Sequence, residues 1–360
     1  MFICSKPLYE TTLGSHLQHQ HDDHEIYIVQ DSTNQSICLE CSRSQLRNPR
    51  LTMKQKSLLL RNMRIGMESR LNTPRSSKLT PMLFQEDRYR SLLQRLVETL
   101  MQQLDANEES SEYANALVDF YHSFLCLERA MPRAMKIAIE ALEDNNSSAV
   151  RLNAHLELIV RACDKKESTK RSVASYTILT KSLLRSGFKA SVDSHTKTIC
   201  ADLLVRLVCC GCERSVNAFA DALGCVFEIL NCTKEIDVTK ALILCVANVQ
   251  RNQIEKYFES DSNASNFVKL LETRLLLLDT KTSVPTLTLN LTSSVVSVCP
   301  SISKHLVSSR IHELVYELLR DVKIHGIRLL LLIFRNAKIR DCASALRVAL
   351  ETITSGIRMC

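Results

Sequence analysis

Apolar residues recur at helical spacing through almost the whole chain from residue 84 onward, and this pattern constrains the fold more than any other feature. One stretch, "RYRSLLQRLVETLMQQL", places on a single helical face Tyr89, Leu92, Leu93, Leu96, Val97 and Leu100. The chain has only seven Gly, seven Pro and no Trp, and 5% of its residues are aromatic. Strand-rich sandwiches and Gly-rich nucleotide-binding folds need more turn residues and aromatics than this. The sequence therefore predicts an all-α protein.

The spacing of the helices narrows this expectation to a repeat architecture. We expect helices at residues 88–104, 111–127, 132–144, 147–163, 172–186, 194–210, 214–230, 238–250, 251–258, 262–278, 286–299, 308–322, 326–337 and 342–357. Paired helices recur at roughly 35–45 residues, the scale of HEAT and armadillo units. The stretch "VTKALILCVANVQ" is apolar on more than one face, as expected for an inner helix flanked on both sides, with "RNQIEKYF" as its short partner. Residues 84–360 are thus predicted to form an armadillo/HEAT-like α-solenoid, and a compact orthogonal helical domain is the alternative.

Residues 1–83 have a different character. They show no sustained period, have prolines at 49, 74 and 81, and change sharply in charge, so we expect a largely disordered segment with a short helix near 52–70. Residues 1–42 hold one Lys against six Asp/Glu, whereas residues 43–81 hold ten Lys/Arg against one Glu. We predict a basic linker that attracts phosphate-rich partners, and a solvated tail or nuclear import signal is the alternative reading. Its candidate residues are Arg43, Arg47, Arg50, Lys54, Lys56, Arg61 and Arg64.

Two further basic clusters lie on the expected helices. Residues 161–197 contain nine Lys/Arg and three acids, and residues 304–340 contain eight and three. Lys181 and Arg185 share one helical face, away from the apolar residues Tyr176, Leu179 and Leu183. Two such clusters on one surface would suit a polyanion such as DNA, although ordinary solvation of helix exteriors explains them as well. The candidate DNA-binding residues are Lys165, Lys166, Lys170, Arg171, Lys181, Arg185, Arg320, Lys323 and Arg328.

No pattern in the sequence indicates catalysis or a cofactor. The chain contains no GxxxxGK[ST], GxGxxG, GxSxG or HExxH motif, and its histidines in the helical part are scattered singly. A zinc site could be built from His16, His19, His21, His24, Cys38 and Cys41, but an irregular polar tail with incidental histidines is the better interpretation. Most of the fifteen cysteines lie in apolar helical patterns and are expected to be reduced and structural, and "CCGC" at 209–212 is expected to be a packed helix end.

Two threonines before prolines, Thr73 and Thr80, are candidate phosphorylation sites in the basic linker, where a phosphate would reduce the positive charge. No apolar run approaches the ~20 residues that span a bilayer, and the first residues lack a signal-peptide pattern. We therefore expect a soluble intracellular protein without a membrane partner.

Several blocks of sequence, taken in order, resemble a known family. The first block is a Leu-Glu-Asp helix end followed by a Ser-rich loop and an Ala/Leu helix. The second is a helix with a basic residue before Ala-Leu. The last three blocks are "FVKLLETRLLLL", "LTSSVVSVCPSISKHLVSSRIHELVYELL" and "VKIHGIRLLL". The matching residues of the first two blocks are Leu142, Glu143, Asp144, Ser147, Ser148, Ala154, Leu156, Leu158, Lys240, Ala241 and Leu242, whereas Ile243 stands where an aromatic is usual. Over about residues 141–335 the chain resembles the N-terminal helical-repeat domain of the Rap-interacting factor family of telomere-associated proteins.

This resemblance implies a nuclear, chromosomal protein acting in telomere maintenance, replication timing and DNA repair, which binds DNA through its helical repeats. The family also recruits a type 1 protein phosphatase, but this chain has no clear RVxF or SILK docking motif, since "RVALE" at Arg347 lacks the closing aromatic. Our leading expectation is a non-enzymatic nuclear solenoid that binds DNA or chromatin. The alternative is an armadillo-type scaffold that holds a peptide or helix of another protein.

Overall fold

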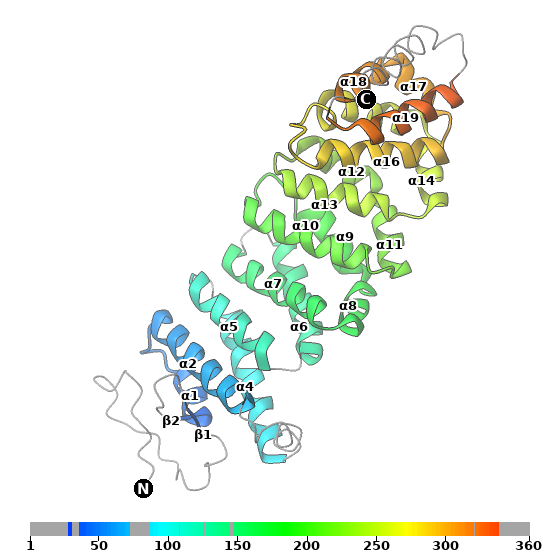
Figure 1. Cartoon of the computed structure of the whole chain (residues 1–360). Coiled ribbons are helices and arrows are strands. Elements are labelled where there is room, and N and C mark those ends of the chain that lie inside the picture. The colour runs from blue at the N-terminus through cyan, green and yellow to red at the C-terminus, as the bar shows by residue number, and fades with distance from the viewer. Residues whose placement is uncertain are drawn as a thin grey trace. The chain divides into compact units, whose positions relative to one another are not determined.

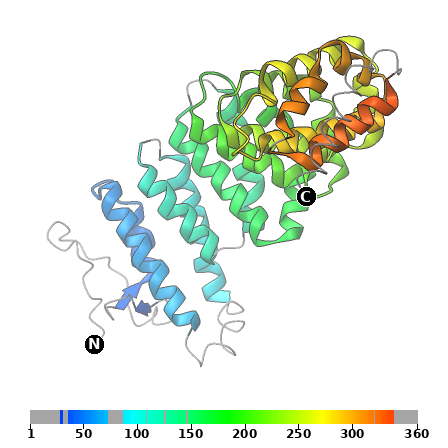
Figure 2. The same cartoon turned by 45° about the horizontal axis from the view of Figure 1, so that its top comes forward.

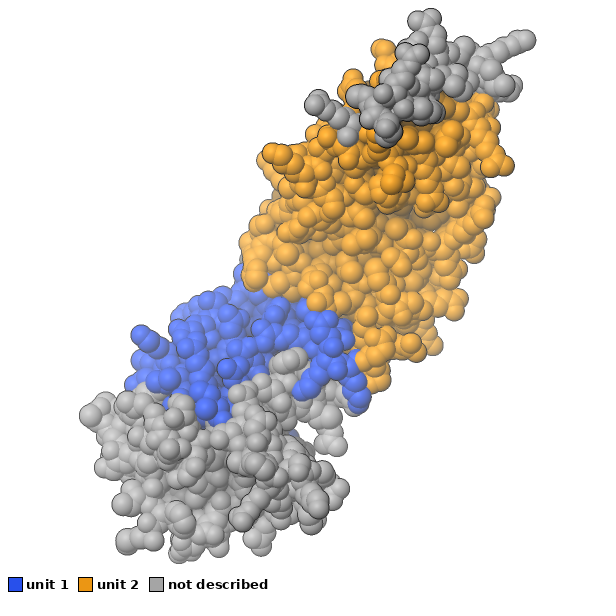
Figure 3. All heavy atoms as spheres, viewed as in Figure 1, with its two compact units in different colours: residues 1–166 blue, residues 167–360 orange. Residues whose placement is uncertain are grey.

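The computed structural model describes residues 28–30, 36–72, 87–107, 109–124, 127–144, 147–319 and 321–337. The chain forms two compact units, residues 1–166 and residues 167–360 (Figure 3). The change in composition predicts a boundary near residue 84, and helices of unit 1 already lie before this residue. The basic stretch packs against the helices that follow it.

Unit 1 consists of helices and one small antiparallel ribbon (Figures 1 and 2). The ribbon pairs β1 (Ile28–Gln30) with β2 (Ser36–Cys38), with Val29 opposite Ile37. The helices are α1 (Leu39–Leu46), α2 (Met53–Asn72), α4 (Asp87–Asp105), α5 (Ser111–Phe124), α6 (Leu127–Glu143) and α7 (Ala149–Lys165). Helix α5 lies between α2 and α7 and packs on both, while α6 packs on α7 and α1 packs on α2 and α4.

Helices α1 and α2 lie within residues 1–83, the segment that we expected to be largely disordered. The short helix expected near residues 52–70 is confirmed by α2, and α1 precedes it. Leu46, Leu59, Leu60 and Met63 are each at most 2% exposed, so the apolar side of the basic stretch belongs to the core of unit 1. The sequence interpretation therefore found α2 but missed α1 and the packing of both helices into the core.

Unit 2 is helical throughout the part that the structure describes. Its elements are α8 (Glu167–Ala174), α9 (Thr177–Ser186), α10 (Ser194–Val208), α11 (Glu213–Ala220), α12 (Leu223–Cys232), α13 (Ile236–Ala247), α14 (Arg251–Phe258), α15 (Asp261–Leu270), the π-helical turn η2 (Leu271–Leu275), α16 (Val284–Val298), α17 (Ile302–Ser308), α18 (Ile311–Leu318) and α19 (Lys323–Asn336). No helix among the described residues is both long enough and apolar enough to cross a membrane.

A row of four helices organises unit 2. Helix α10 packs on α13, α13 packs on α16, and α16 packs on α19, so that the four helices succeed one another in Figure 1. As predicted, the apolar stretch that forms α13 is flanked on both sides, which explains why Val238, Leu242, Ile243 and Cys245 are at most 1% exposed. The short helix α14 follows α13 at the expected residues, 251–258.

Two residues mark the end of α9 and the start of α10. Asp193 is the N-cap of α10, and its carboxylate accepts a hydrogen bond from the backbone N–H of Thr196 at 3.0 Å. Gly187 is the C-cap of α9 and touches α10, because a Cβ atom at this position would lie 2.8 Å from the Sγ atom of Cys200. This close approach fixes how α9 meets α10.

Candidate nucleic-acid interface

Most basic side chains of α1 and α2 contact polar or acidic partners within unit 1. Arg43 donates to the Oγ1 atom of Thr99 at 3.4 Å, and Arg47 donates to the Oε1 atom of Gln102 at 3.3 Å. Lys56 is only 6% exposed and donates from Nζ to the Oε1 atom of Gln103 at 3.2 Å. Burial lowers the pKa of the Lys56 ammonium, because the charged form loses hydration. These three side chains hold α1 and α2 against α4.

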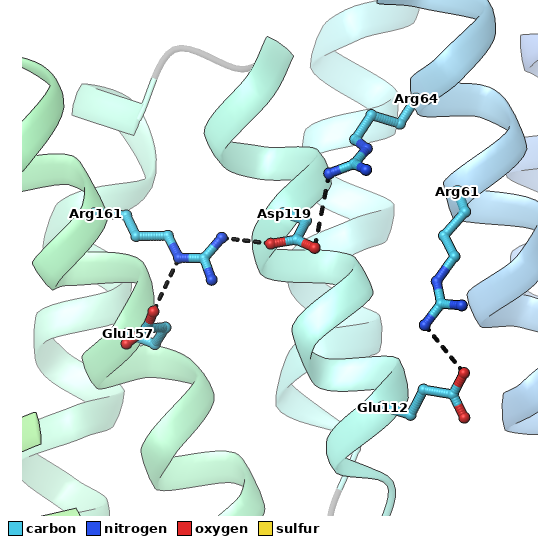
Figure 4. Close-up of polar contacts among 6 residues, drawn as sticks. All are labelled: Arg61, Arg64, Glu112, Asp119, Glu157 and Arg161. Carbon is cyan, nitrogen blue, oxygen red and sulfur yellow. Dashed lines mark hydrogen bonds and ion pairs between the residues drawn. The ribbon is translucent and has the colours of Figure 1, made fainter.

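Two arginines of α2 form ion pairs with α5, and the pairing continues to α7 (Figure 4). Arg61 contacts Glu112 at 3.1 Å, and Arg64 contacts Asp119 at 3.7 Å. The other carboxylate oxygen of Asp119 accepts a hydrogen bond from Arg161, whose Nε atom donates to Glu157 at 2.9 Å. Burial disfavours the charged form of Arg161, but its bonds with Asp119 and Glu157 outweigh that effect and raise its pKa. These ion pairs thus link α2, α5 and α7.

Of the seven predicted linker residues, Arg47, Arg50 and Lys54 are exposed and form no ion pair with a described residue, and Arg47 bonds only to the neutral amide of Gln102. Because most of its cations have polar or acidic partners within unit 1, the stretch is a packed structural element rather than a free linker. Ion pairs already made in the free protein would have to be broken before these arginines could bind phosphate.

The next candidates flank the boundary between the two units. Lys165 is the last residue of α7 and Lys166 is its C-cap, and both are exposed at the end of unit 1. Lys170 and Arg171 belong to α8 in unit 2, where both face Glu167, at 3.7 and 3.5 Å. Glu167 therefore neutralises part of the positive charge that the sequence assigns to this loop.

Helix α9 and the turn after it carry three exposed basic residues close together in the sequence. Lys181 and Arg185 are exposed while Leu179 and Leu183 are buried, which confirms the predicted separation of the two faces. Tyr176 differs from the prediction, because it is the N-cap of α9 and is 40% exposed. Lys189 lies exposed in the turn after α9. Lys181, Arg185 and Lys189 form no ion pair with a described residue, and we call these three side chains the α9 basic row.

The structure does not bring the α9 basic row together with the second predicted cluster. Lys323 and Arg328 are exposed on α19, which packs on α16, α17 and α18, whereas α9 packs on α10, α11 and α12. Helices α10, α13 and α16 lie between them in the row. The contacts of unit 2 therefore do not place the two clusters on neighbouring helices, and the shared surface stays a prediction. Arg320 lies outside the described residues.

The remaining candidates lie wholly or partly outside the described residues. Thr73, Thr80 and the four N-terminal histidines are outside them, while Cys38 belongs to β2 and Cys41 to α1. Among the described residues, no group of three or more His, Cys, Asp or Glu side chains is placed to hold a metal ion.

The "CCGC" segment at the end of α10 is more exposed than the sequence predicts. It does end a helix, since Cys209 is the C-cap of α10 and Gly211 has a φ of 74°. Cys209 is exposed, however, and its Sγ atom accepts a hydrogen bond at 3.2 Å from the Nδ2 atom of Asn248, the C-cap of α13. The segment is therefore a helix end, as predicted, but not a fully packed one.

No family model and no curated protein matches the chain. Among solved structures, the chain is similar to an engineered protein whose crystal structure was determined by the Northeast Structural Genomics Consortium. The TM-score is 0.53 and the sequence identity 14%, over 86% of this chain and 82% of that chain. A second engineered protein from the same consortium has a TM-score of 0.44 and 16% identity, over 72% of this chain and 96% of that chain.

The first of these likenesses supports the helical fold, and the second is too weak to carry an argument. Neither protein is described as binding or transforming anything, so the comparisons add nothing about function. The resemblance to the Rap-interacting factor family stays a prediction from the sequence.

Proposed function

We propose that this chain is a non-enzymatic helical-repeat protein of the HEAT/armadillo type, whose role is to bind another macromolecule. Two features support the α-solenoid architecture. The four row helices of unit 2 begin at Ser194, Ile236, Val284 and Lys323, each packed on the one before it. Shorter helices fill each interval, and the spacing is on the scale of HEAT and armadillo repeats. In such arrays each repeat contacts its neighbours and leaves extended surfaces for partners.

The partner that we propose is DNA or chromatin, bound through its phosphates. The α9 basic row carries this proposal, because its three cations are exposed and lack the carboxylate partners that neutralise Arg61, Arg64 and Arg171. Lysine and arginine side chains in this state can displace counterions from a phosphate backbone without first breaking an ion pair. Such contacts position a protein on a duplex but read little sequence. A nuclear, chromosomal location is part of the proposal and follows from the family resemblance.

The proposal is tested by the salt dependence of duplex binding. Fluorescence anisotropy with a labelled DNA duplex, from 50 to 300 mM salt, should show affinity falling steeply as salt rises. The triple variant Lys181→Ala, Arg185→Ala, Lys189→Ala should bind more weakly, and its slope of log K against log salt should be smaller by about 3, since each lost phosphate contact contributes about 1.

A matched control removes equal charge elsewhere in unit 2. Lys234, Lys256 and Lys269 are exposed, lie on or beside other helices, and form no ion pair with a described residue. Their triple alanine variant should keep the wild-type slope. Equal effects of the two triple variants, or no duplex binding at 50 mM salt, would contradict the proposed interface.

The second candidate function is a scaffold for a protein partner. Leu244 on α13 and Leu331 on α19 are 38% and 60% exposed, and both belong to helices of the row. Exposed leucines on such a surface suit an amphipathic helix or an extended peptide. A partner held in this way should be retained after nuclease treatment and in high salt. Leu244→Asp with Leu331→Asp should release it, whereas the α9 triple variant should not.

A further inference from the structure

One face of α19 carries two apolar residues and two arginines in alternation, and all four are exposed. The positions i, i+4, i+7 and i+11 of this face are occupied by Ile324, Arg328, Leu331 and Arg335. Ile324 is 80% exposed and Leu331 is 60% exposed. We call these four residues the α19 stripe.

The opposite face of α19 packs into unit 2, against α16, α17 and α18. Its buried residues are Gly326, Leu329, Leu330 and Ile333. A Cβ atom at position 326 would lie 2.5 Å from the Cδ2 atom of Leu319, the C-cap of α18, so the two helices approach closely on this face. The α19 stripe does not hold the helix in place, and substitutions in it should leave the fold intact.

The arginines of the stripe have few carboxylates near them. Residues 323–336 contain three Lys/Arg and no Asp or Glu, and α16 and α17 contain no acidic residue either. Helix α18 carries Glu317 and Glu313, and Glu313 pairs with Arg310 at 2.6 Å. Arg328 and Arg335 form no ion pair with a described residue. The stripe therefore presents positive charge between its apolar residues.

The spacing of the stripe is typical of a seam between two helices. Steps of four, three and four residues recur on the side of a helix that packs along a second one. Such a partner would bury Ile324 and Leu331, and it would remove part of the hydration of Arg328 and Arg335. A guanidinium group in this place is stable only with a carboxylate opposite it. The stripe thus favours a partner with carboxylates in register with its own apolar residues.

We propose that α19 is a docking site for an acidic amphipathic helix of another protein. Apolar side chains of this partner cover Ile324 and Leu331, and its carboxylates pair with Arg328 and Arg335. The docking site names a partner class for the second candidate function, the scaffold, and rests on that function. It is independent of DNA binding by the α9 basic row, because none of the four residues belongs to that row.

The charge of α19 disfavours other occupants. A second copy of the stripe would bring four guanidinium groups to one seam without carboxylates between them. Residues 338–360 of the chain itself contain four Lys/Arg against two Asp/Glu, so their net charge has the same sign as that of α19. A DNA duplex would satisfy the arginines through its phosphates but leave the alternating apolar residues uncovered.

Two synthetic peptides test this docking site on the full chain. Each has about 16 residues, long enough to form a helix in part, with Leu at two of four seam positions. The Glu peptide carries Glu at the other two seam positions, and the Lys peptide carries Lys there. In fluorescence anisotropy, the wild-type protein should bind the Glu peptide at least about tenfold more tightly, because like charges meet in the complex with the Lys peptide.

Reversal of the two arginines should reverse this preference. The double variant Arg328→Glu, Arg335→Glu should bind the Lys peptide more tightly than the Glu peptide. The matched control is Lys256→Glu, Lys269→Glu, which reverses two exposed charges on α14 and α15 and should keep the wild-type preference. A reversal limited to α19 separates pairing at the stripe from a general attraction between a basic protein and an acidic peptide.

The apolar half of the stripe is tested with Leu331→Ser. This variant should bind the Glu peptide about fivefold more weakly or worse, since the complex would bury one aliphatic side chain less. Leu277→Ser is the matched control, because Leu277 is 62% exposed and lies outside α19, and it should bind as the wild type does. Circular dichroism should be unchanged in all these variants, because each substituted residue is exposed.

Three results would overturn the inference: equal binding of the two peptides by the wild type, equal losses in Leu331→Ser and Leu277→Ser, or no binding of the Glu peptide at about 0.1 mM protein. A loss of duplex binding in the Arg328→Glu, Arg335→Glu variant, with its peptide preference unchanged, would also overturn it in favour of DNA.

Failure of the scaffold function gives a different result. In that case the nuclease-treated protein retains no protein partner at all. A partner that is retained, but is released by Leu244→Asp alone and not by Leu331→Asp alone, would support the scaffold and contradict the docking site on α19.

Discussion

At the residue scale, Asp105 shows how a single carboxylate ties three helices of unit 1. It ends α4, accepts a hydrogen bond from Arg133 on α6, and lies 3.2 Å from the Nε2 atom of His155, which is fully buried on α7. Burial alone would raise the pKa of Asp105, but the contacts with His155 and Arg133 outweigh it and lower the pKa. The charged form is therefore favoured by folding.

The pH dependence of stability follows from this shift. Because the folded-state pKa lies below the unfolded value of about 3.9, the stabilisation is complete above the unfolded pKa and disappears as pH falls through the folded one. Asp105→Asn should lower the free energy of unfolding by about 1–2 kcal/mol at pH 7, and the difference from wild type should shrink below about pH 5. Urea unfolding measured from pH 3 to pH 7 would show this.

A matched control for Asp105 is Asp202, whose side chain is 50% exposed and which pairs with Arg206 one turn later on α10. Asp202→Asn should cost no more than about 0.5 kcal/mol, because water screens an exposed pair. A constant difference between Asp105→Asn and wild type over the whole pH range would show that the carboxylate charge is not the cause.

At the element scale, α13 carries a buried and an exposed leucine, whose substitution should affect stability differently. Leu242 is fully buried between α10 and α16, whereas Leu244 is 38% exposed two residues later. Leu242→Ala should lower the free energy of unfolding by about 2–5 kcal/mol, because it leaves a cavity. Leu244→Ala should change it by no more than about 0.5 kcal/mol. Chemical denaturation of both variants tests the position of this helix in the row, and similar losses would contradict it.

The sequence predicted the row helices well and the shorter helices less well. The apolar period of α10, α13 and α16 identified them, because buried residues repeat on a helix flanked on both sides. The apolar helical spacing also continues across Tyr176 and Ala222, so the sequence predicted one helix at 172–186 and one at 214–230. The structure divides each in two, with non-helical backbone at φ −88° for Tyr176 and φ −106° for Ala222. Neither break contains Gly or Pro, so no local signal marks it.

For the charged residues of the candidate interface, the sequence predicted which helix face is exposed but not which ion pairs form. Sequence spacing correctly separated Lys181 and Arg185 from the buried leucines of α9, since helical periodicity decides which side faces the core. It could not show that Arg61, Arg64 and Arg161 have carboxylate partners, because Glu112 and Asp119 lie on α5, between the helices that carry the arginines. Pairing between helices depends on tertiary packing, which composition does not encode.

At the scale of the molecule, a destabilising substitution in one row helix of unit 2 should loosen the neighbouring helices most and the distant ones least. Each row helix packs on the next, and repeat proteins behave as chains of nearest-neighbour interactions. Leu204 on α10 is fully buried. Leu204→Ala should accelerate native-state hydrogen exchange most in α9, α10 and α13, and least in α19. A uniform acceleration over all the described helices of unit 2 would instead indicate a single cooperative core.

The ion-paired arginines of α2, Arg61 and Arg64, affect any attempt to shorten the protein. Composition alone would suggest trimming everything before residue 84 as a tail, and that cut would remove α1 and α2 completely. Glu112 would then lose Arg61, Asp119 would lose Arg64, and the side of α5 that packs on α2 would meet water. A chain trimmed in this way would expose an apolar and acidic side of α5 that the intact protein covers, and it would tend to self-associate. The most basic part of the sequence thus belongs to the packed core of unit 1.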